Sequence, residues 1–348
     1  MPADHAGPRG ARGGQGCPRT MRKSVTMSGE TAWQGGGRPG AIAVVDVPTA
    51  PWWGERVVRI DWRALDQLLP FVDRNVLFRH HWGFRGLPKP EWDALAAAEL
   101  EPALHALWRD AKLRRWLEPA GAYGYFPVRA VGDSLMVFDP TAFSAGAREA
   151  DLPVAASFSF PRQRDDRTPR TRDRLCIADY FRDGRDGSYD VIALQVVTAG
   201  RKAGEHAQAL MGAGEYDRGL RVHGIASVVA EGLAEWLSVR IRRELGLVGS
   251  GPSEAVDGAS GAFRGRRYSW GYGSCPDLED QAPLVRLLPS VTSALGMDFT
   301  AGHQWDPEQS TAAFVVHHPQ ATYFHVLERS GDVALDDRAD PDISATDQ

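Results

Sequence analysis

The sequence has few of the features that mark secreted, disulfide-rich or membrane-spanning proteins. It contains only three cysteines in 348 residues, Cys17, Cys176 and Cys275. They are too widely spaced for a C-x-x-C metal site or a disulfide framework. No apolar run approaches the length of a transmembrane helix, and residues 1–40 lack the apolar segment of a secretory signal. We therefore expect a cytoplasmic protein.

Other familiar signals are also missing. A net charge of −5 gives no general attraction to nucleic acid or to a membrane surface, and neither is expected as a partner. No Gly-x-Gly-x-x-Gly follows a predicted strand, so a Rossmann nucleotide site is not indicated. The pairs His80-His81 and His317-His318 suggest a metal, but adjacent side chains on a strand point to opposite faces. No metal site is predicted.

What is present divides into three parts. Residues 1–44 are basic and rich in glycine and arginine, and we expect a disordered tail. Residues 329–348 are acidic and are predicted to form a second disordered tail. Residues 45–328 have the ordinary apolar content of a globular domain and are long enough to bury a sizeable core.

Periodicity within 45–328 predicts an α+β fold. Short strands separated by Gly, Asp and Pro are typical of an antiparallel sheet. The expected strands are 51–58, 122–128, 134–138, 155–160, 190–197, 312–317 and 322–327. The expected helices are 62–69, 90–116, 216–245 and 278–288.

The densest group of restrictive residues lies at 264–281. Arg266 and Arg267 offer planar forks that suit a carboxylate. Gly271 allows close approach to the backbone, and neighbouring aromatic residues such as Tyr272 can pack on a flat ring or a cation. Two interpretations are open, a loop that binds a small ligand and a Gly-rich turn whose arginine is exposed to solvent.

The helix predicted at 216–245 carries an apolar stripe on one face and two acids on the other. The stripe consists of Val222, Ile225, Val229, Leu233 and Trp236. Glu231 and Glu235 project from the opposite face, one turn apart. They form either a solvated surface or a docking surface for another protein.

Taken together, a series of segments in chain order resembles the C-terminal S-adenosylmethionine-binding activation domain of cobalamin-dependent methionine synthase. The resemblance covers about residues 50–328. Its most specific part is Arg267-Tyr-Ser-Trp-Gly-Tyr272, which fits the Arg-x-x-x-Gly-Tyr ligand motif of that family. The other segments include 52–58, 78–86, 123–127 with Gly132-Asp133, 160–163, 175–181, 223–235, 308–311 and 317–324.

The resemblance implies a C-shaped single domain, built on a bent antiparallel sheet with flanking helices, that binds S-adenosylmethionine. In that family arrangement Asp133 would take the ligand's ammonium group and Arg267 would grip its carboxylate. The residues implied at the ligand are Asp133, Arg267, Gly271, Tyr272, Tyr323 and Phe324. The resemblance assigns no catalytic residue. Trp82, Glu231 and Glu235 are implied at the cleft or at a docking surface.

Three hypotheses about function follow. The sequence has no Asp-x-His-x-x-Gly triplet of the kind that binds cobalamin, so the first hypothesis places cobalamin on a methionine synthase partner. The chain would then act as a separate activation protein, with a flavodoxin-like protein supplying the electron, and would not complete methyl transfer by itself. The second hypothesis is a stand-alone S-adenosylmethionine sensor. The third, an independent methyltransferase, lacks a convincing general base.

Overall fold

The computed structural model describes residues 42–146, 148, 151–163, 174–248, 254–255 and 262–326. These residues belong to one compact unit, Gly37–Gln348. Apart from residues 42–44, both predicted tails lie outside the described residues. Ala43 contacts the far end of the described chain, because its amide donates to Gln320 Oε1 over 2.8 Å and its carbonyl lies 2.9 Å from His318 Nε2.

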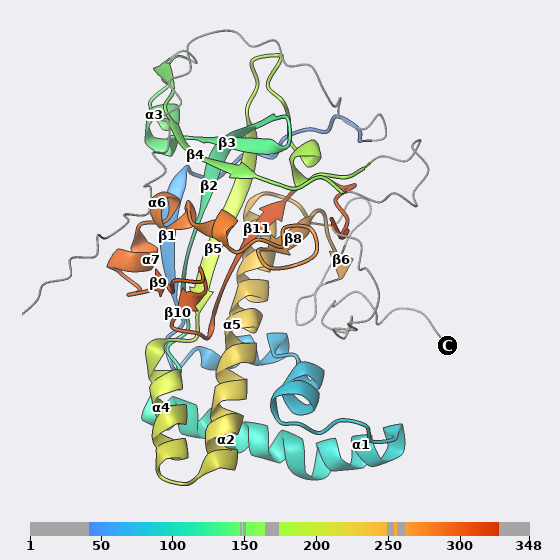
Figure 1. The fold of residues 1–348 in the computed structure, drawn as a ribbon, viewed down its shortest axis with the longest axis vertical. Coiled ribbons are helices and arrows are strands. Elements are labelled where there is room, and N and C mark those ends of the chain that lie inside the picture. Colours follow the sequence, from blue (N-terminus) through green and yellow to red (C-terminus); the bar gives the residue numbers. More distant parts are fainter. Residues whose placement is uncertain are drawn as a thin grey trace, which may run out of the picture. The chain divides into compact units, whose positions relative to one another are not determined.

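A seven-stranded antiparallel sheet forms the centre of this unit (Figure 1). Its strands follow the order β4–β3–β2–β5–β11–β8, and β1 pairs with the first half of β2. The strands are β1 Gly54–Arg59, β2 Ala120–Val131, β3 Ser134–Phe138, β4 Val154–Ser159, β5 Asp190–Thr198, β8 Arg266–Ser269 and β11 Ser310–Val316. Two short pairs complete the strands, β6 Glu254–Ala255 with β7 Ala262–Phe263, and β9 Asp298–Phe299 with β10 Trp305–Asp306.

Helices cover the sheet, and the longest is α5, Tyr216–Glu244. This helix ends where Gly246 adopts a positive φ of 68° and the Leu247 amide bonds back to the Arg242 carbonyl over 2.8 Å. The other helices are η1 Leu65–Phe71, η2 Val76–His81, α1 Lys89–Leu95, η3 Ala96–Leu100, α2 Glu101–Arg114, α3 Pro140–Ser144, η5 Ile177–Tyr180, α4 Arg201–Gly212, η6 Glu279–Gln281, α6 Leu284–Leu287 and α7 Ser290–Ser293.

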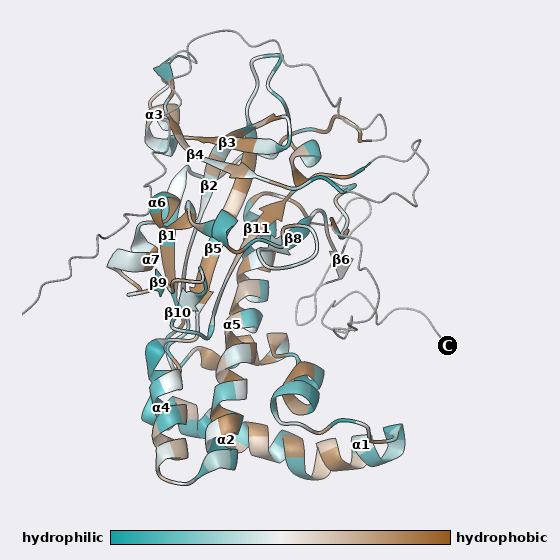
Figure 2. Cartoon of the chain, viewed as in Figure 1, coloured by the Kyte–Doolittle hydropathy of each residue, from teal (hydrophilic) through white to brown (hydrophobic). Residues whose placement is uncertain are grey.

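Two hydrophobic cores lie on opposite faces of the sheet. On one face α5 packs against β5 and β11, and the apolar stripe predicted for it is buried there together with α2 and α4. On the other face Phe126, Phe158 and Phe314 pack with α6 and α7. Strand β5 is buried along its whole length because both of its faces are covered. Figure 2 shows this as hydrophobic colouring in the central strands. The prediction of a single α+β domain around an antiparallel sheet is confirmed.

Several details differ from the sequence expectations. The helix predicted at 90–116 is divided into α1, η3 and α2. Helix 278–288 is divided into η6 and α6 at Pro283, which has no amide hydrogen to continue the first turn. The helix predicted at 62–69 begins later, as η1. Residues 322–326 form no strand. The Val326 amide donates a hydrogen bond to the carbonyl of Gly273, a turn residue, and not to a neighbouring strand. Strand β8 and helix α4 were not predicted.

Candidate functional site

The edge strand β8 directs Arg267 toward helix α5. Arg267 lies opposite Val315 of β11, whose side chain belongs to the core beneath α5. Because side chains alternate along a strand, the next residue, Tyr268, points to the other face. There its ring stacks on Phe314 with ring centres 5.6 Å apart. The strand therefore buries Tyr268 in one core and presents the preceding residue, Arg267, to the helix on the other face.

The guanidinium group of Arg267 forms ion pairs with two glutamates of α5. Its Nε atom lies 3.0 Å from Glu235 Oε2, and its Nη1 atom lies 3.6 Å from Glu231 Oε2. The exposed fraction of the side chain is 17% for Arg267, 25% for Glu235 and 49% for Glu231. The two acids are one helical turn apart, so a single guanidinium reaches both of them.

The charges of this cluster change the pKa values of Arg267 and Tyr272. Burial by itself would lower the pKa of Arg267, but the carboxylates of Glu235 and Glu231 outweigh it and hold the pKa above its ordinary value. The negative charge of Glu231, followed by burial, raises the pKa of Tyr272, while Arg267 opposes the change. The phenol of Tyr272 is therefore neutral at neutral pH.

The turn after β8 places backbone and an aromatic ring beside this ion pair. Gly271 has a positive φ of 90°, which residues with a Cβ rarely adopt, and its amide donates to the Cys275 carbonyl over 2.9 Å. The following Tyr272 is 56% exposed. A large exposed aromatic side chain next to charged groups is a suitable surface for a cationic or planar ligand.

The two aromatic residues predicted near the C-terminal end of the domain have different positions. The Tyr323 hydroxyl donates to the Arg267 carbonyl over 2.8 Å, so it supports β8 from its open edge. Phe324 is buried in the core on the opposite face of the sheet, and its carbonyl accepts from Ser274 over 2.6 Å. Of the pair, Tyr323 contacts the Arg267 strand directly, whereas Phe324 holds the turn that follows it.

Asp133 lies away from Arg267. It occupies the turn between β2 and β3, and three strands separate β3 from β8 in the sheet order. Its carboxylate accepts from Arg162 Nη2 over 2.6 Å, and the same guanidinium binds the buried Asp179 over 2.7 Å. The structure thus gives Asp133 an arginine partner of its own, and its predicted role at the ligand ammonium stays a prediction.

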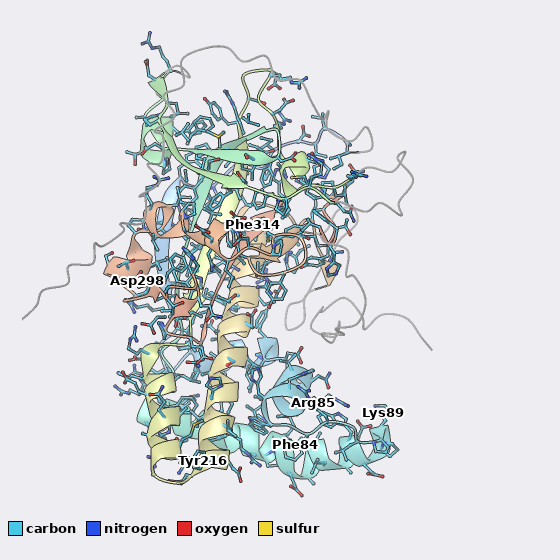
Figure 3. The ribbon with its side chains drawn as sticks, viewed as in Figure 1. Phe84, Arg85, Lys89, Tyr216, Asp298 and Phe314 are labelled. Carbon is cyan, nitrogen blue, oxygen red and sulfur yellow. The ribbon has the colours of Figure 1, made fainter. Side chains whose placement is uncertain are left out.

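Trp82 follows the π-helical segment η2 and packs near the N-terminal half of α5. Its indole nitrogen donates to the Arg221 carbonyl over 3.3 Å. Glu231 lies ten residues further along α5, which corresponds to about 15 Å of helix. Figure 3 shows Phe84 among the helices, well away from Phe314 in the sheet. The segment Trp82–Phe84 is therefore separate from the Arg267 cluster.

The structure thus brings together Arg267, Glu231, Glu235 and Tyr272, with Tyr323 bonded to the Arg267 carbonyl and Gly271 in the turn just before Tyr272. An arginine beside two carboxylates can bind a zwitterion, because one end of such a ligand needs a cation and the other an anion. Among the described residues, no group of three or more His, Cys, Asp or Glu side chains is arranged to hold a metal ion. Within the same residues, no helix is both long enough and apolar enough to cross a membrane.

Fold and site together define an α+β domain in which an arginine of an edge strand faces two glutamates of a long helix. The comparison with known families is more specific. The family described as "Vitamin B12 dependent methionine synthase, activation domain" matches residues 64–339, and the chain belongs to this family.

Similar proteins and structures agree with this assignment. The chain is 34% identical over 312 residues to methionine synthase of Mycobacterium tuberculosis, covering 83% of this chain and 24% of that protein. It is 34% identical over 307 residues to the methionine synthase of Mycobacterium leprae, covering 81% of this chain and 23% of the relative. The chain therefore spans about a quarter of these relatives. A crystal structure of the MetH reactivation domain bound to AdoHcy superposes with a TM-score of 0.69 at 22% identity, over 84% of this chain and 88% of that one, which shows a shared fold.

Proposed function

We propose that this chain binds S-adenosylmethionine and presents it to cobalamin carried by a methionine synthase partner. The observation that carries the proposal is the partly buried Arg267 beside Glu235 and Glu231 on helix α5. S-adenosylmethionine has a carboxylate, an ammonium and a sulfonium group. An arginine, two acids and an exposed tyrosine supply a complementary group for each of them.

In this proposal Arg267 binds the ligand carboxylate, and an acid close to it binds the ammonium. Glu231 suits the second role because it is half exposed and lies 3.6 Å from Arg267. Asp133 remains a second candidate for the ammonium. Calorimetric titration of Glu231→Gln and Asp133→Asn distinguishes them, since we expect the first to weaken binding about tenfold. A loss confined to Asp133→Asn would transfer the role to Asp133.

The function of the domain would then be to position the ligand. The methyl group passes from sulfur to reduced cobalt, the sulfur keeps the electron pair of the broken bond, and S-adenosylhomocysteine remains. A flavodoxin-like protein is the proposed source of the electron that reduces the cobalt. The partner would dock on the surface around the two glutamates, and the Trp82 segment, which packs against α5 apart from them, is a second candidate contact. A cytoplasmic location is part of the same proposal.

The proposal is tested by titrating the full chain with S-adenosylmethionine and by asking whether a cobalamin protein co-purifies with it. We expect stoichiometric ligand binding and recovery of a methionine synthase chain. Ligand binding without recovery or reactivation of a cobalamin protein would favour a stand-alone S-adenosylmethionine sensor. The absence of ligand binding would overturn the proposal.

A further inference from the structure

Arg242 lies beneath the ligand-binding pair, and its side chain is 0% exposed. It is on α5, two turns after Glu235, and its Nη1 atom lies 4.0 Å from Glu235 Oε1. Its Nη2 atom donates to the Gly265 carbonyl over 3.4 Å. A buried guanidinium has lost its hydration and requires fixed acceptors in return. These two contacts connect Arg242 to the acid of α5 that pairs with Arg267 and to the residue that directly precedes β8.

Four charges of alternating sign run from the interior to the surface. Their order is Arg242, Glu235, Arg267 and Glu231, with neighbours 4.0, 3.0 and 3.6 Å apart. The innermost side chain is fully buried, and the outermost is half exposed. Glu235 therefore lies between two arginines, and it keeps a cationic neighbour even when Arg267 turns toward a ligand.

The second contact fixes the start of β8. Gly265 has a positive φ of 84°, and a Cβ atom at this position would lie only 2.1 Å from the Val316 carbonyl oxygen. The backbone of Gly265 is thus pressed against β11, two residues before Arg267. Arg242 on α5 donates a hydrogen bond to the Gly265 carbonyl and so helps to keep the Gly265 backbone close to Val316.

We propose that Arg242 is a positioning residue for the carboxylate-binding arginine, acting through Glu235 and through the Gly265 carbonyl. The inference rests on the proposed function, because it concerns the same S-adenosylmethionine site. Arg242 itself would not contact the ligand. It gives Glu235 a cationic neighbour when Arg267 turns toward the ligand carboxylate, so that this partly buried acid is not left uncompensated.

The test compares two ligands by calorimetry on the full chain. S-adenosylmethionine has the amino-acid end that Arg267 would bind, and 5′-methylthioadenosine lacks it. Arg242→Met is expected to weaken S-adenosylmethionine binding about tenfold and to change 5′-methylthioadenosine binding less than twofold. Arg240→Met is the matched control. Arg240 lies on the same helix, 2.8 Å from Glu244, and its loss should leave both affinities unchanged.

A double-mutant cycle gives a readout that a merely structural role would not move. In a Glu235→Gln background the same Arg242→Met change should weaken S-adenosylmethionine binding no more than threefold. The cycle decides the question if 5′-methylthioadenosine binds too weakly to measure. If the Met variant fails to fold, Arg242→Lys replaces it. One ammonium cannot make both contacts, so we expect a loss of about threefold for S-adenosylmethionine alone.

The outcomes separate this inference from the function on which it rests. A wild-type chain that binds neither ligand overturns both. A chain that binds S-adenosylmethionine equally well with and without Arg242 overturns the inference alone. Equal weakening of the two ligands would show that Arg242 only stabilises the fold, and the same loss in the Glu235→Gln background would exclude action through Glu235. Either result would also overturn the inference.

Discussion

Replacing Arg267 by alanine tests the candidate site at its centre. In the free protein this guanidinium already has Glu235 at 3.0 Å and Glu231 at 3.6 Å. Ligand binding would therefore exchange a carboxylate of the protein for a carboxylate of the ligand. The gain is the difference between a buried charge-assisted pair and a partly solvated one, about 2–3 kcal/mol. We expect Arg267→Ala to weaken S-adenosylmethionine binding roughly 30- to 150-fold.

The same change should have a smaller effect on folding. Glu235 keeps Arg242 at 4.0 Å, and Glu231 is half exposed to water, so neither acid is left buried and uncompensated. We expect a loss of about 1–2 kcal/mol in the free energy of unfolding, measured by urea titration. This modest loss is what allows the binding measurement to be made on a folded variant.

The assay is isothermal titration of wild type, Arg267→Ala and a control, Arg264→Ala. Arg264 lies three residues upstream, and its Nε atom donates to the His317 carbonyl over 3.1 Å, outside the site. The control should bind within twofold of wild type. If Arg267→Ala also binds with wild-type affinity, Arg267 is not at the ligand and the arrangement proposed above is refuted.

Three further predictions concern the rest of the chain. The purified chain should not retain cobalamin, because the sequence lacks the binding triplet; a stoichiometric corrinoid spectrum would contradict this. A hydrogen bond from Lys112 lowers the pKa of Asp66, so this contact stabilises the fold above about pH 4 and is lost as Asp66 becomes protonated. Lys112→Met should therefore reduce urea stability at pH 6 and less so at pH 3, and an equal reduction at both would exclude the linkage. Burial raises the pKa of Cys176 to about 12 and also raises that of Cys275. In a Cys17→Ser variant both thiols should react with a disulfide reagent only after unfolding, and rapid reaction of the native protein would show that one of them is accessible.

The elements with strong local periodicity were predicted well. Helix α5 has an apolar stripe at three- and four-residue spacing, and its predicted span of 216–245 differs from the observed one by a single residue. Strand β8 was missed because it contains only four residues, two of them arginines. It is a strand because β11 supplies its hydrogen-bond partners, and a partner more than forty residues away leaves no local pattern.

The candidate site could be predicted only in part from the sequence. The resemblance and the residue chemistry both identified Arg267, but neither showed that Glu231 and Glu235 face it across a gap of some thirty residues. One signal was overlooked. Eleven residues from Glu231 to Arg242 make three turns of helix plus about 20°, so these two residues and Glu235 share one face. Two acids and a cation in such a line on one face of a helix indicate a charge network.

The most direct test of the central proposal is reactivation in trans. A methionine synthase without its activation domain, holding cob(II)alamin, is mixed at saturating concentration with this chain, S-adenosylmethionine and an electron donor. We predict loss of the cob(II)alamin absorption band and formation of methylcobalamin, with Arg267→Ala much less effective at subsaturating ligand. No change beyond the control without this chain, from a chain that demonstrably binds S-adenosylmethionine, would contradict the activation role.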